Sequence, residues 1–137
     1  RYTKYIGTTI EFDDVLGKNS LPVIADKSVN PEFGTGVLKV TPAHSKEDYE
    51  IGLRHNLPVK SIIGVDGRLT ASAGKYAGLT IKECRAQIVA DLQEMGLIEK
   101  IDENYVNTVP VDYRSGDYIE NLVLPNWYVR VDNLKKP

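Results

Sequence analysis

The sequence predicts an α+β domain that is rich in β-strands, with a partly closed, barrel-like sheet and two principal helices. Short runs of β-branched and aromatic residues recur along the chain, and turn residues separate them. Two longer segments, 45–56 and 80–96, carry the start and stop signals of helices. The length of 137 residues suits one domain with a modest core. Many strands with two helices among them are typical of a β-rich α+β fold.

The predicted strands follow from local composition and from the turn residues that bound them. Before the first helix, we expect strands at 4–12, 21–25 and 37–41, with a loop at 13–20 and a turn at 31–36. Between the helices, we expect a strand at 59–65, an Asp-Gly turn at 66–67 and a loop at 74–78. After the second helix, strands are expected at 97–101, 105–111, 118–124 and 127–131. These patterns do not determine the order of the strands in the sheet.

The first helix is predicted to begin at Ser45. Ser45 and Asp48 fit a capping box, in which the hydroxyl accepts a backbone N–H and the carboxylate reaches back to the N-cap. The buried side of this helix is expected to contain Tyr49, Ile51 and Leu53. Asn56 is the residue at which we expect the helix to end.

The second helix has a clearer pattern. Thr80 and Glu83 form another capping box at its start. Four residues then recur at helical spacing on one face: Cys84, Ile88, Leu92 and Met95. Gly96 stands where a C-terminal cap belongs, because glycine readily adopts the left-handed conformation that ends many helices.

Composition excludes several classes of protein. The formal net charge is -2, so the surface as a whole does not attract nucleic acid, and any RNA contact has to be local. The single cysteine, Cys84, excludes an internal disulfide and a cysteine-rich zinc site. No apolar run approaches the roughly 20 residues that span a bilayer, and the start does not resemble a signal peptide. Because the chain begins without Met and ends near strand-like residues, we expect it to be a piece of a longer cytoplasmic protein.

One segment, residues 34–49, collects groups that could carry chemistry. Lys39 and Thr41 are two apart in an expected strand, so their side chains point to the same face. The helix that begins just after them offers free N–H groups and a positive dipole end to an anion. The segment thus brings together an ammonium, a hydroxyl, the imidazole of His44 and the carboxylate of Asp48.

Each of these residues also has a purely structural interpretation. Asp48 and Ser45 can be helix caps, and a cap is typically worth about 1 kcal/mol. Lys39 can be a solvated strand lysine, and His44 can be a hydrogen-bonding residue beside a turn. His44, His55 and Asp48 could together suggest a metal site. We do not favour this interpretation, because no cysteine and no second histidine stands close to His44 in the sequence. The residue types alone therefore leave the chemistry open.

The order of the residues is more specific than their types. The run NPEFGTGVLKVTPAHSKEDYEIGLRHNLP at 30–58 contains KVTPAH followed by DYE. DGR at 66–68, YAGL at 76–79 and RSGDYIENLVLPNWYV at 114–129 follow in the chain. This order resembles the editing insertion of class I aminoacyl-tRNA synthetases of the valyl, isoleucyl and leucyl group, with the valyl version most similar. The resemblance covers almost the whole chain. It implies an editing domain at 1–113 and a segment that returns toward the synthetic domain at 114–137.

The resemblance implies hydrolysis of wrongly charged tRNA. A site made for valine cannot strongly reject the nearly isosteric threonine, and valyl enzymes are the established example of a second, hydrolytic site that removes it. By this resemblance, Asp48 holds the α-ammonium of the misattached amino acid. Lys39 and Thr41 line the pocket and contact the terminal adenosine or the threonyl group, which makes these three the expected catalytic residues. The further residues that the resemblance assigns to substrate binding are His44 at the pocket wall, Ser45 and Val40.

The chain departs from the family pattern at two points. Ser45 stands where family members commonly have Asp, so one polar contact to the substrate is changed. The preceding editing strand, of the Thr-Arg-Pro-Glu-Thr type, is absent. We therefore expect this chain to carry half of the pocket and, in isolation, to be less active than a complete synthetase.

The resemblance also implies partners. These are the 3′ end of tRNA(Val), threonine as the misattached amino acid and the rest of the synthetase in the same polypeptide, with no membrane. No cofactor is implied here, because ATP and magnesium belong to the synthetic domain. Two alternatives stay open. One is an isoleucyl editing domain, and the other is a non-catalytic fragment that binds tRNA phosphates through Arg114, Arg130, Lys135 and Lys136.

Overall fold

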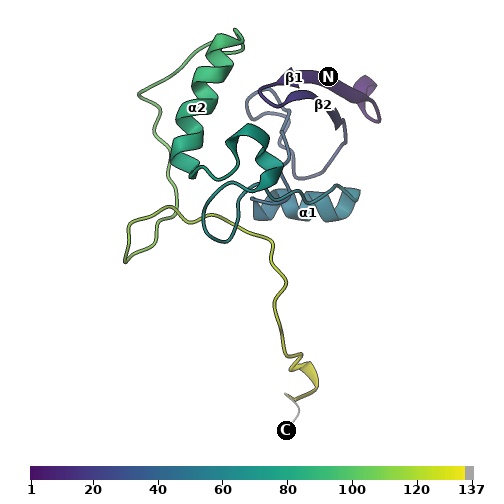
Figure 1. Cartoon of the computed structure of the whole chain (residues 1–137). Helices are drawn as coiled ribbons and strands as arrows, with labels where there is room; N and C mark the ends of the chain where they lie inside the picture. Colours follow the sequence, from purple (N-terminus) through teal and green to yellow (C-terminus); the bar gives the residue numbers. More distant parts are fainter. Residues whose placement is uncertain (135–137) are drawn as a thin grey trace.

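The computed structural model describes residues 1–134 and combines two helices with one small sheet (Figure 1). In chain order the elements are the 3-10 helix η1 (Thr3–Tyr5), strands β1 (Thr9–Asp14) and β2 (Gly17–Pro22), helix α1 (Lys46–His55), the 3-10 helix η2 (Ala71–Tyr76), helix α2 (Ile81–Glu94) and the 3-10 helix η3 (Asp132–Leu134). This mixture of helix and strand agrees with the predicted α+β class. Lys135 and Lys136 lie outside the described residues.

β1 and β2 pair along their whole length as an antiparallel hairpin. At the turn, the Leu16 N–H donates to the Asp14 carboxylate at 2.7 Å, and Gly17 has a φ of 106°. Such a φ favours glycine, which has no Cβ to clash with the backbone. The predicted loop at 13–20 is therefore wrong, since most of it is strand. The strand predicted at 4–12 begins only at residue 9.

The predicted barrel-like closure is also wrong. Within residues 1–134 the sheet has two strands and does not close. Beyond the hairpin, residues 23–134 form only isolated bridges, which are Ile63 with Leu69, Arg68 with Thr80 and Val111 with Tyr118, and the strands predicted there do not form. β-propensity reports that a side chain fits a pleated surface, and it does not supply the neighbouring strand that completes a ladder. The sequence pattern therefore predicted extended segments without predicting their partners.

Both predicted helices are confirmed, because their start and stop signals are local. Ser45 caps α1 by accepting the Asp48 N–H at 3.2 Å, and Asn56 ends the helix with a left-handed φ of 52°. At the start of α2, Thr80 and Glu83 form the complete capping box, with each side chain accepting the backbone N–H of the other residue.

The buried face of α1 differs in part from the predicted one. Ile51 is buried, with 1% of its surface exposed, and Tyr49 is half-buried, whereas Leu53 is 61% exposed. Beside Ile51, the bare backbone of Gly52 lies on Pro42, and a Cβ added at Gly52 would lie 2.9 Å from the Pro42 Cβ. Residues 51 and 52 therefore press α1 against the chain segment that precedes it, and Leu53 turns to solvent.

A small core lies between the hairpin turn, η2 and α2. Its buried members are Leu69, Ala73, Tyr76 and Cys84, and the partly buried residues packed against them are Val15, Ile63, Leu79 and Ile88. The Tyr76 hydroxyl donates to the carboxylate of Asp91 on α2, which also pairs with the Lys75 ammonium at 2.7 Å. Apolar packing and this polar contact together hold η2 against α2.

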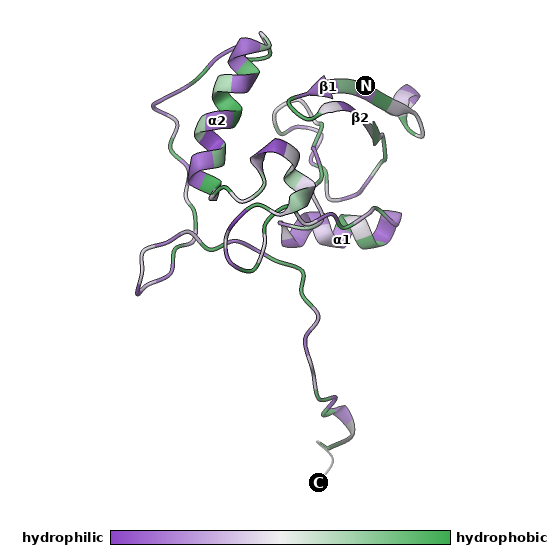
Figure 2. Cartoon of the chain, viewed as in Figure 1, coloured by the Kyte–Doolittle hydropathy of each residue, from purple (hydrophilic) through white to green (hydrophobic). Residues whose placement is uncertain are grey.

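Residues 99–134 follow α2 without a further α-helix or strand, and the end of this segment extends away from the helices and the hairpin (Figure 1). Hydrophobic residues recur along this segment (Figure 2), and they are exposed: Trp127 by 103%, Tyr128 by 87% and Val129 by 80%. These side chains have no packing partner within residues 1–134. In the same part of the chain, no helix has both the length and the apolar character needed to cross a membrane.

Candidate active site

The segment that enters α1 has a path set by backbone packing. Gly36 has a φ of 74°, and a Cβ added there would lie 2.9 Å from the carbonyl oxygen of Pro31. At the other end of the segment, Pro42 and Ala43 are buried under α1. Residues 37–41 therefore run between two fixed points. They do not form the predicted strand.

Lys39 and Thr41 lie side by side on this segment. The Lys39 ammonium donates to the Thr41 hydroxyl at 2.5 Å. Their predicted position on one face is therefore confirmed, although the segment between them has no β-ladder. Lys39 is exposed and Thr41 is half-buried, so the pair places a positive charge at the surface and a hydroxyl beneath it.

Asp48 reaches across to the same segment. Its Oδ2 accepts the Thr41 N–H at 2.6 Å. The predicted capping box is thus half right: Ser45 accepts the Asp48 N–H, but the Asp48 carboxylate binds Thr41 and does not return to Ser45. Within residues 1–134, Oδ1 has no hydrogen-bond donor from the protein. The half-buried carboxylate is therefore held through one oxygen and keeps acceptor capacity on the other.

Two further predicted site residues flank this group. Ser45 donates its hydroxyl to the Glu47 carboxylate at 3.3 Å and accepts the Asp48 N–H as the cap of α1, which leaves one lone pair of the hydroxyl for a further donor. Val40 is half-buried between Lys39 and Thr41. Neither residue changes the charge of the site, which consists of the Lys39 ammonium and the Asp48 carboxylate.

His44 follows the same loop, but both of its ring nitrogens contact backbone groups. Nδ1 lies 3.1 Å from the carbonyl oxygen of Asn121, and Nε2 accepts the Ile62 N–H at 3.1 Å. His55 lies at the other end of α1, against Asp26. The predicted site is therefore a cluster of Lys39, Thr41 and Asp48, with His44 bonded beside it.

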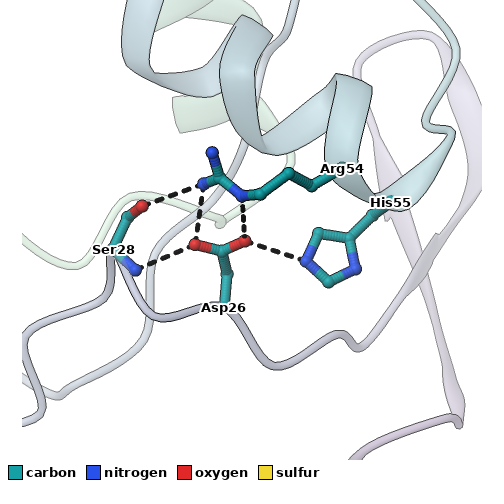
Figure 3. A network of polar contacts seen from close by, with 4 residues as sticks. All are labelled: Asp26, Ser28, Arg54 and His55. Carbon is teal, nitrogen blue, oxygen red and sulfur yellow. Dashed lines mark hydrogen bonds and ion pairs between the residues drawn. The ribbon is translucent and has the colours of Figure 1, made fainter.

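A polar network that sequence reasoning missed anchors the C-terminal end of α1 (Figure 3). The Asp26 carboxylate is 4% exposed and accepts two hydrogen bonds from Arg54, from Nε and Nη2, each at 2.9 Å. It also accepts the Ser28 N–H at 2.8 Å and lies 2.9 Å from His55 Nε2. Asp26 followed two residues later by Ser28 is a local turn signal, but nothing local points to partners on a helix 28 and 29 residues away.

Asp26 predicts how acid affects stability. The Arg54 guanidinium, followed by the Ser28 N–H, holds the pKa of Asp26 well below its ordinary value of 3.8. Because the pKa of Asp26 is lower in the folded chain than in the unfolded chain, its full contribution to stability is present above pH 3.8. As the pH falls below 3.8, the unfolded chain takes up a proton first, and this contribution to stability decreases. In Asp26→Asn, we expect lower stability at neutral pH and about one proton less taken up on unfolding below pH 3.8.

Urea unfolding of both proteins at a series of pH values between neutral and strongly acidic measures this difference. Asp13→Asn is a matched control, because Asp13 is an exposed carboxylate on the hairpin. Parallel stability curves for Asp26→Asn and the unchanged chain would contradict the assignment.

The Lys39, Thr41 and Asp48 cluster combines groups suited to a zwitterionic or ester ligand. A carboxylate with one free oxygen can accept an ammonium, and an adjacent lysine can stabilise negative charge on a nearby oxygen. Of its three residues, Lys39 is exposed, and Thr41 and Asp48 are half-buried. A depression of about 470 Å³ that is lined in part by Lys18, Lys60 and Lys75 lies elsewhere and includes none of the predicted site residues.

The chain is similar in sequence to one group of known proteins. No protein-family model matches the chain. Valine–tRNA ligase of Protochlamydia amoebophila is 40% identical over 136 residues, which are 99% of this chain and 14% of that protein. The Symbiobacterium thermophilum and Francisella tularensis valine–tRNA ligases are 46% identical over 117 residues and 41% identical over 138 residues, respectively. The chain thus spans only 13% to 15% of the length of these relatives.

Proposed function

This chain belongs to the valine–tRNA ligase family as one segment of it, and from that premise we propose that it hydrolyses tRNA(Val) wrongly charged with threonine. The observation that carries the proposal is the Asp48 carboxylate, held through Oδ2 by the Thr41 N–H with its other oxygen available. A misattached amino acid retains a free α-ammonium group. A half-buried carboxylate next to a lysine is suited to hold that group while the ester lies toward the Lys39 and Thr41 pair.

The reaction needs only water and a positioned ester. A water oxygen attacks the ester carbonyl carbon, and negative charge develops on the carbonyl oxygen. The bond between that carbon and the ribose oxygen then breaks, and a proton from the water passes to the ribose oxygen. The products are free threonine and a tRNA with its terminal hydroxyl restored. In this proposal, the Lys39 ammonium and the Thr41 hydroxyl stabilise the developing charge, and Asp48 fixes the orientation of the ester.

The remaining assignments follow from the family. Val40 and Ser45 border the bound amino acid, and the 3′ end of tRNA(Val) approaches the open surface above Lys39. The rest of the synthetase, in the same polypeptide, supplies valine activation with ATP and magnesium. We place the protein in the cytoplasm, where charged tRNA is used for translation.

The test is a deacylation assay with the full-length synthetase that contains this chain. Preformed Thr-tRNA(Val), Val-tRNA(Val) and Val-tRNA(Ile) are incubated with the protein, and the loss of the amino acid is followed. We expect Thr-tRNA(Val) to be hydrolysed at least about tenfold faster than the other two, because the threonine hydroxyl is what the site has to recognise. Faster hydrolysis of Val-tRNA(Ile) would favour an isoleucyl editing domain. Binding of tRNA without hydrolysis would favour a non-catalytic role.

A further inference from the structure

The two ring nitrogens of His44 have fixed and opposite roles. A carbonyl oxygen can only accept, so Nδ1, at 3.1 Å from the Asn121 oxygen, has to carry the hydrogen. A backbone N–H can only donate, so Nε2, at 3.1 Å from the Ile62 nitrogen, has to be bare. His44 is therefore a neutral imidazole with the Nδ1–H tautomer. Its one lone pair is already used, so it has no free nitrogen with which to accept a proton from water.

The contact with Asn121 links two parts of the chain. Among the hydrogen bonds and ion pairs of residues 1–134, it is the one that joins residues 99–134 to the residues before them. The other polar contacts of that segment are local, such as the Ile119 N–H to the Pro110 oxygen at 3.1 Å. Next to Asn121, Leu122 is half-buried, whereas its neighbours in the segment are exposed.

His44 is also connected to the Asp48 site through the backbone. Its N–H donates to the carbonyl oxygen of Thr41 at 3.3 Å, which closes a turn over residues 41–44. The N–H of Thr41 in turn donates to Asp48 at 2.6 Å. A displacement of the imidazole therefore moves the turn over residues 41–44, and with it the Thr41 N–H that holds the Asp48 carboxylate.

We propose that His44 is a positioning residue that fastens the segment around Asn121 to the Thr41 and Asp48 site. Its imidazole holds the Ile62 and Asn121 backbones at a fixed separation, and its own backbone holds the turn at Thr41. This role rests on the proposed hydrolytic function for its effect on rate. It replaces the expected role of His44 in binding substrate, because both nitrogens are committed to backbone groups. Through His44, the position of residues 119–124 therefore affects the positions of Thr41 and Asp48.

The experiment compares His44→Ala, His44→Asn and His44→Gln in the full-length synthetase. An asparagine amide places a donor near the position of Nδ1, and a glutamine carbonyl reaches the position of Nε2. Each isostere thus keeps one of the two contacts. His55→Ala is the matched control, since His55 lies at the far end of α1 and contacts Asp26, away from the turn that holds His44. Hydrogen exchange of the peptide that covers 59–63, which contains the Ile62 N–H, and cleavage after Glu120 by a glutamate-specific protease are measured by mass spectrometry, together with kcat and KM for deacylation of Thr-tRNA(Val).

For His44→Ala we expect at least about tenfold faster exchange at 59–63, about tenfold faster cleavage after Glu120 and a kcat about tenfold lower with an unchanged KM, because the site is mispositioned and substrate contacts remain. His44→Asn should restore slow cleavage after Glu120 only, and His44→Gln slow exchange at 59–63 only. Unchanged cleavage after Glu120 in His44→Ala would overturn the proposal, and so would a raised KM with unchanged kcat. If His44→Ala does not fold, failure of His44→Asn to slow the cleavage after Glu120 would overturn it. The exchange and cleavage results hold or fail even if the unaltered synthetase does not deacylate Thr-tRNA(Val), so the two proposals fail separately.

Discussion

Replacing Asp48 by alanine in the full-length synthetase is expected to slow the hydrolysis of Thr-tRNA(Val) by about 100-fold or more. The substitution removes the carboxylate proposed to hold the α-ammonium, and it also removes the acceptor of the Thr41 N–H at 2.6 Å. Losing one preorganised polar contact to a reacting group typically costs about 10² to 10³ in rate. Single-turnover deacylation of preformed Thr-tRNA(Val) measures the effect. Valine activation and tRNA binding in the same preparation should not change.

Asp48→Asn separates charge from position. An asparagine oxygen can still accept the Thr41 N–H, so the loop keeps its path, but the side chain no longer pairs with an ammonium. We expect Asp48→Asn to lose most of the activity that Asp48→Ala loses. Glu47→Ala is the control, since Glu47 is an exposed carboxylate of the same helical turn and contacts only the Ser45 hydroxyl among the described residues. Equal activity of Asp48→Ala and Glu47→Ala would refute the proposed role.

The parts of the fold that the sequence predicts well are those decided within a few residues. Ser45 and Thr80 start helices because their side chains accept N–H groups three residues away. Lys39 and Thr41 meet because they are two residues apart in an extended segment. Such contacts need no knowledge of how the chain packs, so a local pattern is sufficient to predict them.

The parts that it does not predict depend on partners distant in the chain. In a capping box, the Asp48 carboxylate would accept the backbone N–H of Ser45. It accepts the Thr41 N–H instead, because Pro42 and Gly52 bring the loop onto α1. The closure of a barrel depended in the same way on strand partners, which no local pattern specifies. His44 is bonded to a carbonyl 77 residues away, and a histidine beside a turn gives no indication of that distance.

Replacing Tyr76 by alanine is expected to cause the largest loss of stability among single substitutions in the core. Tyr76 is 1% exposed and packs with Leu69, Ala73 and Cys84, so its removal leaves a cavity under α2. Truncating a buried aromatic side chain typically costs about 3 to 5 kcal/mol. Small domains have only about 5 to 15 kcal/mol in total, so the variant should unfold at a much lower urea concentration. Urea titration followed by far-ultraviolet circular dichroism measures the change.

Tyr76→Phe shows how much of that loss comes from the hydroxyl. The ring remains in the core, and only the hydrogen bond to Asp91 is lost. Because Asp91 still pairs with Lys75 at 2.7 Å, its carboxylate is not left without a partner, and the cost should be about 1 kcal/mol. Tyr105→Ala is the control, since Tyr105 is 75% exposed and a surface substitution typically changes stability by no more than about 0.5 kcal/mol. If Tyr76→Ala and Tyr105→Ala lost similar stability, the cluster around Tyr76 would not be the core that stabilises α2. Truncating a side chain that fills a core has to cost more stability than truncating an exposed side chain.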